Sequence, residues 1–270
     1  MGNSEKAAGH PAVASLPRFF AEAGQIDEQM GRARICGNDV RHIRDVLRRK
    51  PGDGLVVCDG CGIDYVCAIA ELGRSEIVAD ILERRVSAGE PSVQAVLWQC
   101  QPKGDKFDRI VRQTVEAGVH EIVPVVSERA LYADSPLDQG PAVERRLARW
   151  RRIAEEAAKQ SRRGRVPAIG RPAYFIDAVR QCADASAPGA RSIIPYEECA
   201  GYTLRQALTG EAAGAARINI FIGPEGGFAP GEIAYAQNAG IRPVSLGPRI
   251  LRTETAGLAV ISAIMYEREA

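Results

Sequence analysis

Two stretches near the C-terminal end decide the fold expected of this chain: Ile220-Phe221-Ile222-Gly223-Pro224-Glu225-Gly226-Gly227-Phe228 and Leu246-Gly247-Pro248-Arg249-Ile250-Leu251-Arg252-Thr253-Glu254-Thr255-Ala256. Each begins with a short apolar run that breaks at a glycine, which predicts a strand ending in a tight loop. Glycine has no Cβ, so its main chain can come close to a ligand. Two such loops at the ends of neighbouring parallel strands predict a crevice that binds a small molecule.

The chain from residue 93 onward alternates short apolar runs with segments of helical periodicity. We predict strands over residues 93–100, 121–126, 192–194, 218–222 and 243–246. We predict helices over residues 106–117, 144–162, 202–208, 230–239 and 254–267. Apolar strands that alternate with helices are typical of an α/β domain built on a parallel sheet.

The first third of the chain is rich in strand signals. Predicted strands over 56–58 and 64–69 flank Asp59-Gly60, a hairpin-turn signal, and a third strand is predicted over 76–82. A helix is predicted over 39–49, because Pro51-Gly52 stops it. Short strands joined by tight turns predict a small barrel. We therefore expect a loose tail over 1–16, a barrel domain over 17–88 and an α/β domain over 89–270, with a linker at 87–91.

Composition places the chain among ordinary globular proteins. Its 270 residues are 46% hydrophobic and carry a formal net charge of +1. No apolar run is long enough to cross a bilayer, and the N-terminus lacks the apolar core of a secretory signal. The seven cysteines are scattered and odd in number, which fits a reducing compartment better than a disulfide framework. These observations predict a cytoplasmic protein without a membrane partner.

Positive charge is concentrated in two parts of the chain. One runs from Arg41 to Lys50 and the other from Arg145 to Arg165. Local basic faces matter more for nucleic-acid binding than the total charge does. The alternative is that both are solvated helix faces, because acidic residues dilute the second cluster.

Several kinds of site find little support in the sequence. The glycine loops contain no Gly-Lys-Ser/Thr, and their spacing is not that of a dinucleotide fingerprint. No histidine pair or acidic cluster predicts a metal, and the three histidines lie far apart, against a Ser-His-Asp triad. Cys58, Cys61 and Cys67 raise the possibility of zinc, but a second close pair is missing. Cys58 and Cys61 also flank the predicted hairpin turn, which is the interpretation we favour.

Two arginines stand in the second glycine-containing stretch, just ahead of the last predicted helix. Arg249 or Arg252 could lie over a reacting group, since guanidinium is the usual donor to planar or anionic partners. The alternative is that they bind phosphate or pair structurally with Glu225 or Glu254.

The two glycine-containing stretches and several other segments of the chain resemble those of a known family. The two stretches closely resemble the signature loops of the bacterial 16S ribosomal RNA uracil-N3 methyltransferases, which belong to the SPOUT class. The resemblance extends from about Leu16 to Tyr266 and includes Pro17–Phe20, His42–Arg48, Lys103–Lys106, Glu116–Val119 and Ala157–Arg163. Lys159 stands where the family commonly has an acid, and Arg162 where a glycine is usual. Both departures add positive charge near the expected RNA face.

The resemblance implies a fold, a cofactor and partners. The fold is a PUA-like RNA-binding β-barrel followed by a SPOUT methyltransferase domain with an α/β trefoil knot and a parallel sheet. The cofactor is S-adenosylmethionine, no metal is needed, and the partners are 16S rRNA, within the small ribosomal subunit, and a second copy of the chain. Three loops would hold the cofactor: Ile194, Pro195 and Tyr196; Ile222, Gly223, Pro224, Glu225 and Gly226; and Ser245, Leu246, Gly247, Ile250, Leu251, Arg252 and Thr253.

The implied reaction methylates N3 of a uridine. Uracil N3 carries a proton, and its anion spreads charge over N3 and two carbonyl oxygens, which a guanidinium can stabilise. We assign this catalytic role to Arg252, with Arg249 next. Glu225 is a candidate proton acceptor whose alternative role is to brace its loop.

RNA contacts are expected from both domains. The candidates are Arg18, His42 and Arg48 in the barrel and Lys103, Gln160 and Arg163 in the methyltransferase domain. A surface or packing role is the alternative for each.

Two other functions compete with this one. The chain could be a related knotted methyltransferase that acts on transfer RNA or on a ribose 2′-hydroxyl, or a non-catalytic RNA-binding assembly factor. Intact glycine loops with both arginines argue against lost catalysis. The predicted barrel and the Arg-Thr-Glu-Thr-Ala segment favour the ribosomal RNA enzyme.

Overall fold

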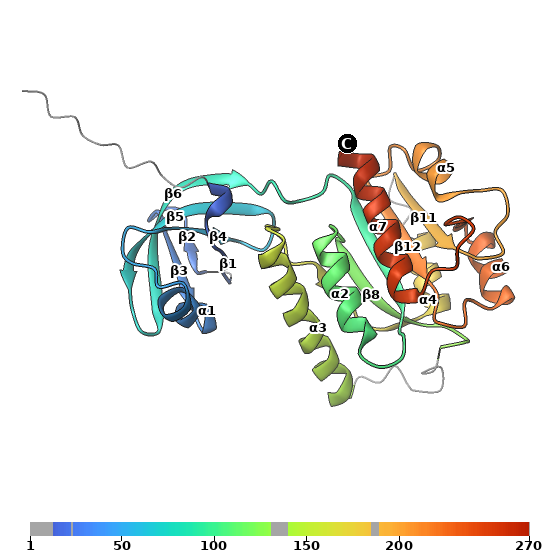
Figure 1. Cartoon of the computed structure of the whole chain (residues 1–270), viewed down its shortest axis with the longest axis horizontal. Coiled ribbons are helices and arrows are strands. Elements are labelled where there is room, and N and C mark those ends of the chain that lie inside the picture. Colours follow the sequence, from blue (N-terminus) through green and yellow to red (C-terminus); the bar gives the residue numbers. More distant parts are fainter. Residues whose placement is uncertain (1–12, 23, 131–139, 185–188, 270) are drawn as a thin grey trace, which may run out of the picture. The chain divides into compact units, whose positions relative to one another are not determined.

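The computed structural model describes residues 13–22, 24–130, 140–184 and 189–269, and these form two compact units (Figure 1). The first unit contains the described residues through Glu90 together with Arg162–Val166. The second contains Pro91–Ser161 and the described residues from Pro167 onward. The domains predicted from the sequence are contiguous, whereas the first unit of the structure also includes residues 162–166. The predicted tail, residues 1–16, lies mostly outside the described residues.

An ion pair between distant residues explains why residues 162–166 belong to the first unit. The guanidinium of Arg163 donates to Glu90, with Nη2 2.9 Å from Oε2. Glu90 Oε1 also accepts from the main-chain N–H groups of Gly164 and Arg165, both at 3.0 Å. The Arg163 side chain is only 2% exposed. A charge so far from water needs such partners, so the segment stays against the first unit.

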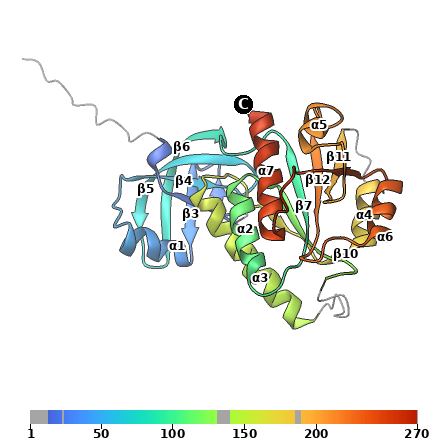
Figure 2. The same cartoon turned by 45° about the vertical axis from the view of Figure 1, so that its right-hand side comes forward.

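The first unit is a curled six-stranded sheet (Figure 2). In spatial order its strands are β1 (Arg18–Phe20), β4 (Gly54–Cys58), β5 (Ile63–Leu72), β6 (Glu76–Val86), β3 (Arg32–Cys36) and β2 (Ile26–Asp27). Only β1 and β4 pair in parallel; the other pairs are antiparallel. A short helical turn, η1 (Val13–Ser15), precedes β1. The strands predicted from the hairpin signal are confirmed as β4, β5 and β6.

The predicted hairpin turn between Cys58 and Ile63 is confirmed. Asp59 Oδ1 accepts from the N–H groups of Cys61 at 2.7 Å and Ile63 at 3.0 Å, which closes the turn. Cys58 is buried, and burial raises the pKa of its thiol to about 12, whereas Cys61 is exposed. Zinc binds the thiolate, so this environment disfavours a metal. Among the described residues, no group of three or more metal-ligating side chains is found.

The helix predicted over 39–49 is shorter than expected. The α-helical part, α1, covers only Asn38–Arg41 and continues as one π turn, η2, over His42–Val46. The chain leaves this helix at Arg48, whose φ of 50° lies in the left-handed region. The sequence did not show that the helix ends early, because the residues at its predicted end are Arg and Lys, which are good helix formers.

The second unit contains the parallel sheet predicted from the sequence. In spatial order its strands are β10 (Ala173–Tyr174), β8 (Glu121–Val126), β7 (Gln94–Cys100), β12 (Arg217–Ile222), β11 (Ala190–Pro195) and β13 (Arg242–Val244), with β9 (Ala168–Ile169) also paired to β8. Every one of these pairings is parallel. The carboxyl ends of β11, β12 and β13 therefore meet at one edge. The trefoil knot stays a prediction.

Helices cover both faces of this sheet (Figures 1 and 2). On one face, α2 (Lys106–Glu116) packs against α3 (Pro141–Gln160) and α7 (Thr253–Glu269). On the other, α4 (Phe175–Asp184) packs against α6 (Pro230–Asn238). The short α5 (Leu204–Thr209) contacts α7. None of the described helices has the length and apolar content to span a membrane.

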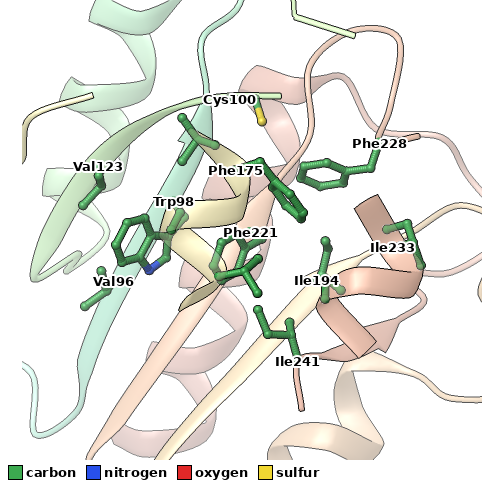
Figure 3. Packing of buried hydrophobic residues seen from close by; sticks show 14 residues of the cluster. Val96, Trp98, Cys100, Val123, Phe175, Ile194, Phe221, Phe228, Ile233 and Ile241 are labelled. Atoms are coloured by element: carbon green, nitrogen blue, oxygen red, sulfur yellow. The ribbon is translucent and has the colours of Figure 1, made fainter. Parts of the chain in front are cut away.

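Strand β7 contributes side chains to the core on both faces of the sheet. Val96, Trp98 and Cys100 join the core beneath α4 and α6, where Trp98 stacks on Phe221 with ring centroids 5.6 Å apart (Figure 3). The intervening residues point to the opposite face, as the two-residue period of a strand requires. There Leu97 and Gln99 lie against α7. Both faces of the strand are buried, so its sequence is apolar apart from Gln94 and Gln99.

Candidate functional site

A pocket lies where the carboxyl ends of β11, β12 and β13 meet. Its volume is about 220 Å³. Three segments supply its walls: the turn after β11, the loop after β12 and the chain from β13 into α7. The lining residues are Pro195, Tyr196, Glu197, Ile222, Gly223, Pro224, Gly227, Phe228, Ser245, Leu246, Gly247, Pro248, Arg249, Ile250, Leu251, Thr253 and Ala256. Both glycine-containing stretches are thus brought together, as the sequence predicts.

The loop after β12 is shaped by its glycines. The N–H of Gly227 donates to the carbonyl of Pro224 at 3.0 Å, which closes a tight turn. This turn places Gly227 at φ +68°, a conformation that L residues with a Cβ rarely adopt. A Cβ on Gly223 would lie 3.2 Å from the ring of Phe228, which is itself buried in the core. The main chain therefore forms the pocket wall at these two positions.

The chain leaving β13 is held against the turn after β11 by main-chain hydrogen bonds. The N–H of Ser245 donates to the carbonyl of Tyr202 at 2.8 Å, and the Ser245 carbonyl accepts from Leu204 at 3.0 Å. Next, Gly247 turns the chain with φ +103°. Ile250 follows with 90% of its surface exposed, an unusual position for a large apolar side chain.

A buried polar group joins the two glycine-containing stretches behind the pocket. Thr253 Oγ1 donates to the carbonyl of Gly223 at 2.6 Å and accepts from Gln99 Nε2 at 2.9 Å. Gln99 is fully buried. The sequence analysis predicted Thr253 at the site but missed Gln99, because it lies within an apolar strand far from either loop. The sequence did contain a signal for Gln99, because it is a polar residue inside a run that is otherwise apolar.

Glu225 lies outside the pocket lining and braces its loop. Its Oε1 accepts from Lys106 Nζ at 2.9 Å and from the N–H of Lys103 at 3.1 Å. Partial burial alone would raise the pKa of Glu225, but these hydrogen bonds outweigh burial and hold its pKa below the ordinary value. A carboxyl with a lowered pKa is a weaker base. The structure therefore supports the bracing alternative over proton acceptance.

The two arginines of the second stretch occupy different places. Both side chains are exposed, but Arg249 lines the pocket and Arg252 does not, although its neighbours Leu251 and Thr253 do. The Arg252 carbonyl accepts the N–H groups of Thr255 and Ala256 in the first turn of α7. The carboxylates of Glu225 and Glu254 lie near Lys106 instead, at 2.9 and 3.9 Å.

The structure sorts the predicted cofactor residues. Those that line the pocket are Pro195, Tyr196, Ile222, Gly223, Pro224, Ser245, Leu246, Gly247, Ile250, Leu251 and Thr253. Ile194 is fully buried at the end of β11, and Glu225, Gly226 and Arg252 also fall outside the lining. Lining residues that the sequence analysis did not assign to the pocket are Glu197, Gly227, Phe228, Pro248 and Ala256.

The side chains of two predicted RNA contacts form ion pairs inside the first unit. Arg18 donates twice to Asp64, at 2.5 and 2.9 Å, and the two side chains are 11% and 1% exposed. Arg163 is bound to Glu90 as described above. These ion pairs favour the packing alternative for Arg18 and Arg163. The remaining candidates, His42, Arg48, Lys103 and Gln160, are exposed.

Comparison with known proteins identifies the class. Residues 89–265 match the model of an RNA methyltransferase domain, and residues 35–82 match that of an RNA methyltransferase PUA domain. The curled first sheet and the parallel sheet with its loop pocket are accordingly those of an RNA methyltransferase with a PUA domain.

Individual relatives place the chain more closely. Ribosomal RNA small subunit methyltransferase E of Bacillus subtilis is 30% identical over 94% of this chain and 98% of the relative. The protein of that name from Mycobacterium bovis is 32% identical over 85% of this chain and 84% of the relative. A crystal structure of the Neisseria gonorrhoeae protein of the same name, bound to S-adenosyl methionine, matches with a TM-score of 0.78 at 30% identity, over 93% of this chain and 97% of that one. The chain belongs to the ribosomal RNA small subunit methyltransferase E family, and the predicted resemblance is confirmed.

We expect Gly227→Ala to destabilise the second unit by about 1–2 kcal/mol, because a Cβ is strained at a left-handed φ. The new Cβ would also lie 2.7 Å from Glu197 Oε1. Urea denaturation monitored by tryptophan fluorescence measures the free energy of unfolding of the second unit, since Trp98 and Trp150 both lie in it. Gly231→Ala in α6 is the matched control: its Cβ meets no atom within 4 Å, and we expect no loss. Equal effects of the two changes would contradict the assignment.

Proposed function

We propose that this protein uses S-adenosylmethionine to methylate N3 of a uridine in 16S ribosomal RNA. The observation that carries the proposal is the pocket built from the three predicted loops at the ends of β11, β12 and β13. Membership of the family and the cofactor seen in the relative from Neisseria gonorrhoeae support it.

The residues present in the pocket fit this cofactor. Ile222, Leu246 and Leu251 offer apolar contact for a purine ring and methylene groups. The glycine loops bring main-chain donors and acceptors to the wall where a Cβ would otherwise stand. Glu197 and Arg249 add one charge of each sign, which matches a ligand that carries both. When bound, S-adenosylmethionine supplies a methyl group on a positively charged sulfur.

The residues around the pocket then act on the base. A guanidinium beside a uracil carbonyl stabilises the N3 anion and so favours loss of the N3 proton. We assign this to Arg252, which is exposed between two lining residues and free to meet a base that arrives from outside. Arg249, inside the lining, orients the bound molecules. The target base must leave its stack to reach the pocket.

RNA is held by residues outside the pocket. His42, Arg48, Lys103 and Gln160 keep exposed side chains and are our proposed contacts. A phosphate contact from Arg48 or Lys103 releases counterions, so RNA affinity should fall as salt is added. The proposed substrate, ribosomal RNA of the small subunit, places the reaction in the cytoplasm.

We further propose that the protein acts as a homodimer with its active sites at the subunit interface. Two large apolar side chains of the second unit support this. Ile250, in the wall of the pocket, is 90% exposed, and Tyr266, on α7, is 77% exposed. Ile250 lies beside the pocket, so a second copy that docked over this face would remove its apolar surface from water.

The test of the function is to add the pure protein and methyl-labelled cofactor to small ribosomal subunits that lack the modification. We expect one labelled uridine in 16S rRNA, with the methyl group on N3, located by nuclease digestion and mass spectrometry. Naked 16S rRNA and transfer RNA are the parallel substrates. Label on transfer RNA or on a ribose hydroxyl would contradict the proposal in favour of the related knotted enzyme, and cofactor binding without transfer would indicate an assembly factor.

A further inference from the structure

One carboxylate lines the pocket, and the reaction outlined above assigns it no role. Glu197 lies in the turn after β11, beside Tyr196. The lining contains one acidic and one basic side chain, Glu197 and Arg249. The sequence analysis assigned Pro195 and Tyr196 to the cofactor site but not Glu197, the next residue.

The Glu197 carboxylate is not used within the protein. Among the described residues, no group makes a hydrogen bond or an ion pair with it. Its neighbour Glu198 differs, because Glu198 Oε2 accepts from the hydroxyl of Tyr196 at 2.8 Å. The nearby guanidinium of Arg129 is also engaged, since it donates to the carbonyls of Gly226 and Phe228. Glu197 therefore remains available to a bound molecule.

The position of Glu197 is set by the loop after β12. A Cβ on Gly227 would lie 2.7 Å from Glu197 Oε1 and 3.6 Å from its Cδ. The carboxylate thus lies directly over the turn that Gly227 makes, between the segment after β11 and the segment after β12. A glycine at this turn leaves the space that the carboxylate occupies.

The chemistry of methyl transfer changes the charge that this carboxylate meets. The methyl donor has a sulfonium cation, an ammonium and a carboxylate, whereas the demethylated product has a neutral thioether and keeps the other two groups. A negative side chain in a partly enclosed pocket favours the ligand with the extra positive charge. An amide of the same shape does not.

We propose that Glu197 is the counter-charge to the sulfonium and determines the preference of the pocket for the methyl donor over the demethylated product. This inference rests on the proposed function, and it assigns to this residue the preference by which a new donor molecule replaces the product after each turnover. The carboxylate binds the charged donor well and the neutral product less well. The proposal concerns a binding preference and involves no covalent step.

Calorimetric titration of the full-length chain with three ligands tests the proposal. They are S-adenosylmethionine, S-adenosylhomocysteine and sinefungin, in which an amine-bearing carbon replaces the sulfonium. The Glu197 side chain is exposed, and exposed ion pairs change an equilibrium by up to about fivefold. Glu197→Gln should therefore raise the Kd of S-adenosylmethionine and sinefungin about fivefold and leave that of S-adenosylhomocysteine within about twofold.

The matched control is Glu198→Gln, which keeps an acceptor for the Tyr196 hydroxyl and should leave all three affinities unchanged. An equal loss for the three ligands in Glu197→Gln would overturn the inference, because it would show that Glu197 recognises a group they share. Unchanged affinities would overturn it as well. If the unaltered protein bound none of the three, the proposed cofactor itself would be wrong, so the two failures are distinguishable. Unfolding midpoints of both variants verify that the fold is kept.

Discussion

Replacing Arg252 with alanine should lower the turnover number about 100- to 1000-fold, the usual cost of removing one group that stabilises a developing anion. Arg252 does not line the pocket, so the Kd of S-adenosylmethionine should stay within about twofold. The effect belongs in the turnover number because the guanidinium interacts with the N3 anion and much less with neutral uracil. Single-turnover methylation of small subunits, together with calorimetric titration of the cofactor, measures the two quantities separately.

Arg249→Ala is the comparison for this prediction. Arg249 lines the pocket, so its removal should raise the cofactor Kd and affect turnover less. Arg252→Lys keeps the charge but loses the planar fork of donors, and we expect it to restore only part of the activity. If Arg252→Ala changed only the Kd while Arg249→Ala abolished turnover, the roles that we assign to the two arginines would be exchanged.

Arg18→Ala should destabilise the first unit by about 3–5 kcal/mol, because it leaves the carboxylate of Asp64 buried without its partner. Asp64 is 1% exposed and is bound by two hydrogen bonds from Arg18. Arg85, at 3.9 Å from Asp64, is too distant to replace them. Hydrogen exchange read on peptides from β1, β4 and β5 measures the loss within this unit, which contains neither tryptophan.

Two further variants define what Arg18 does. The double change Arg18→Met with Asp64→Leu removes both charges and should recover most of the stability, since an apolar pair of similar size often replaces a buried ion pair without loss. Arg48→Ala removes an exposed cation and should leave exchange unchanged while weakening RNA binding. If Arg18→Ala left exchange unchanged and weakened RNA binding instead, the original prediction of an RNA contact would be right.

Local pattern was enough to predict the strands and helices that line the pocket. The apolar runs before Gly223 and Gly247 become β12 and β13, and the alternation from residue 93 onward becomes the parallel sheet. The prediction of β12 succeeded because a strand buried on both faces is mostly apolar along its length. Elements with weaker patterns were missed. The short strands β9 and β10 and the helix α4 do not appear among the predicted ranges, although α4 carries Phe175 into the core.

Residues that act through distant partners could not be found in this way. Gln99 meets Thr253 across 154 positions, and Glu90 meets Arg163 across 73. Arg18 and Arg163 look like free cations in the sequence, because nothing nearby in the chain shows the carboxylate that each one binds. Periodicity indicates which face of an element is buried, but it does not indicate which other element packs against that face.

By itself, the amino-acid sequence determined the class of fold, the family and the loops that meet at the pocket. Glycine position and apolar periodicity are local properties, because they can be read from residues that are neighbours in the chain. Only the tertiary structure decided that Glu225 braces a loop and that Arg249 lies inside the pocket lining while Arg252 lies outside it. It also decided that Glu197 faces the pocket without a hydrogen bond or ion pair from any residue that the structure describes. Those assignments depend on distances between side chains that are far apart in the chain, and such distances exist only once the sheet, its helices and its loops have packed together.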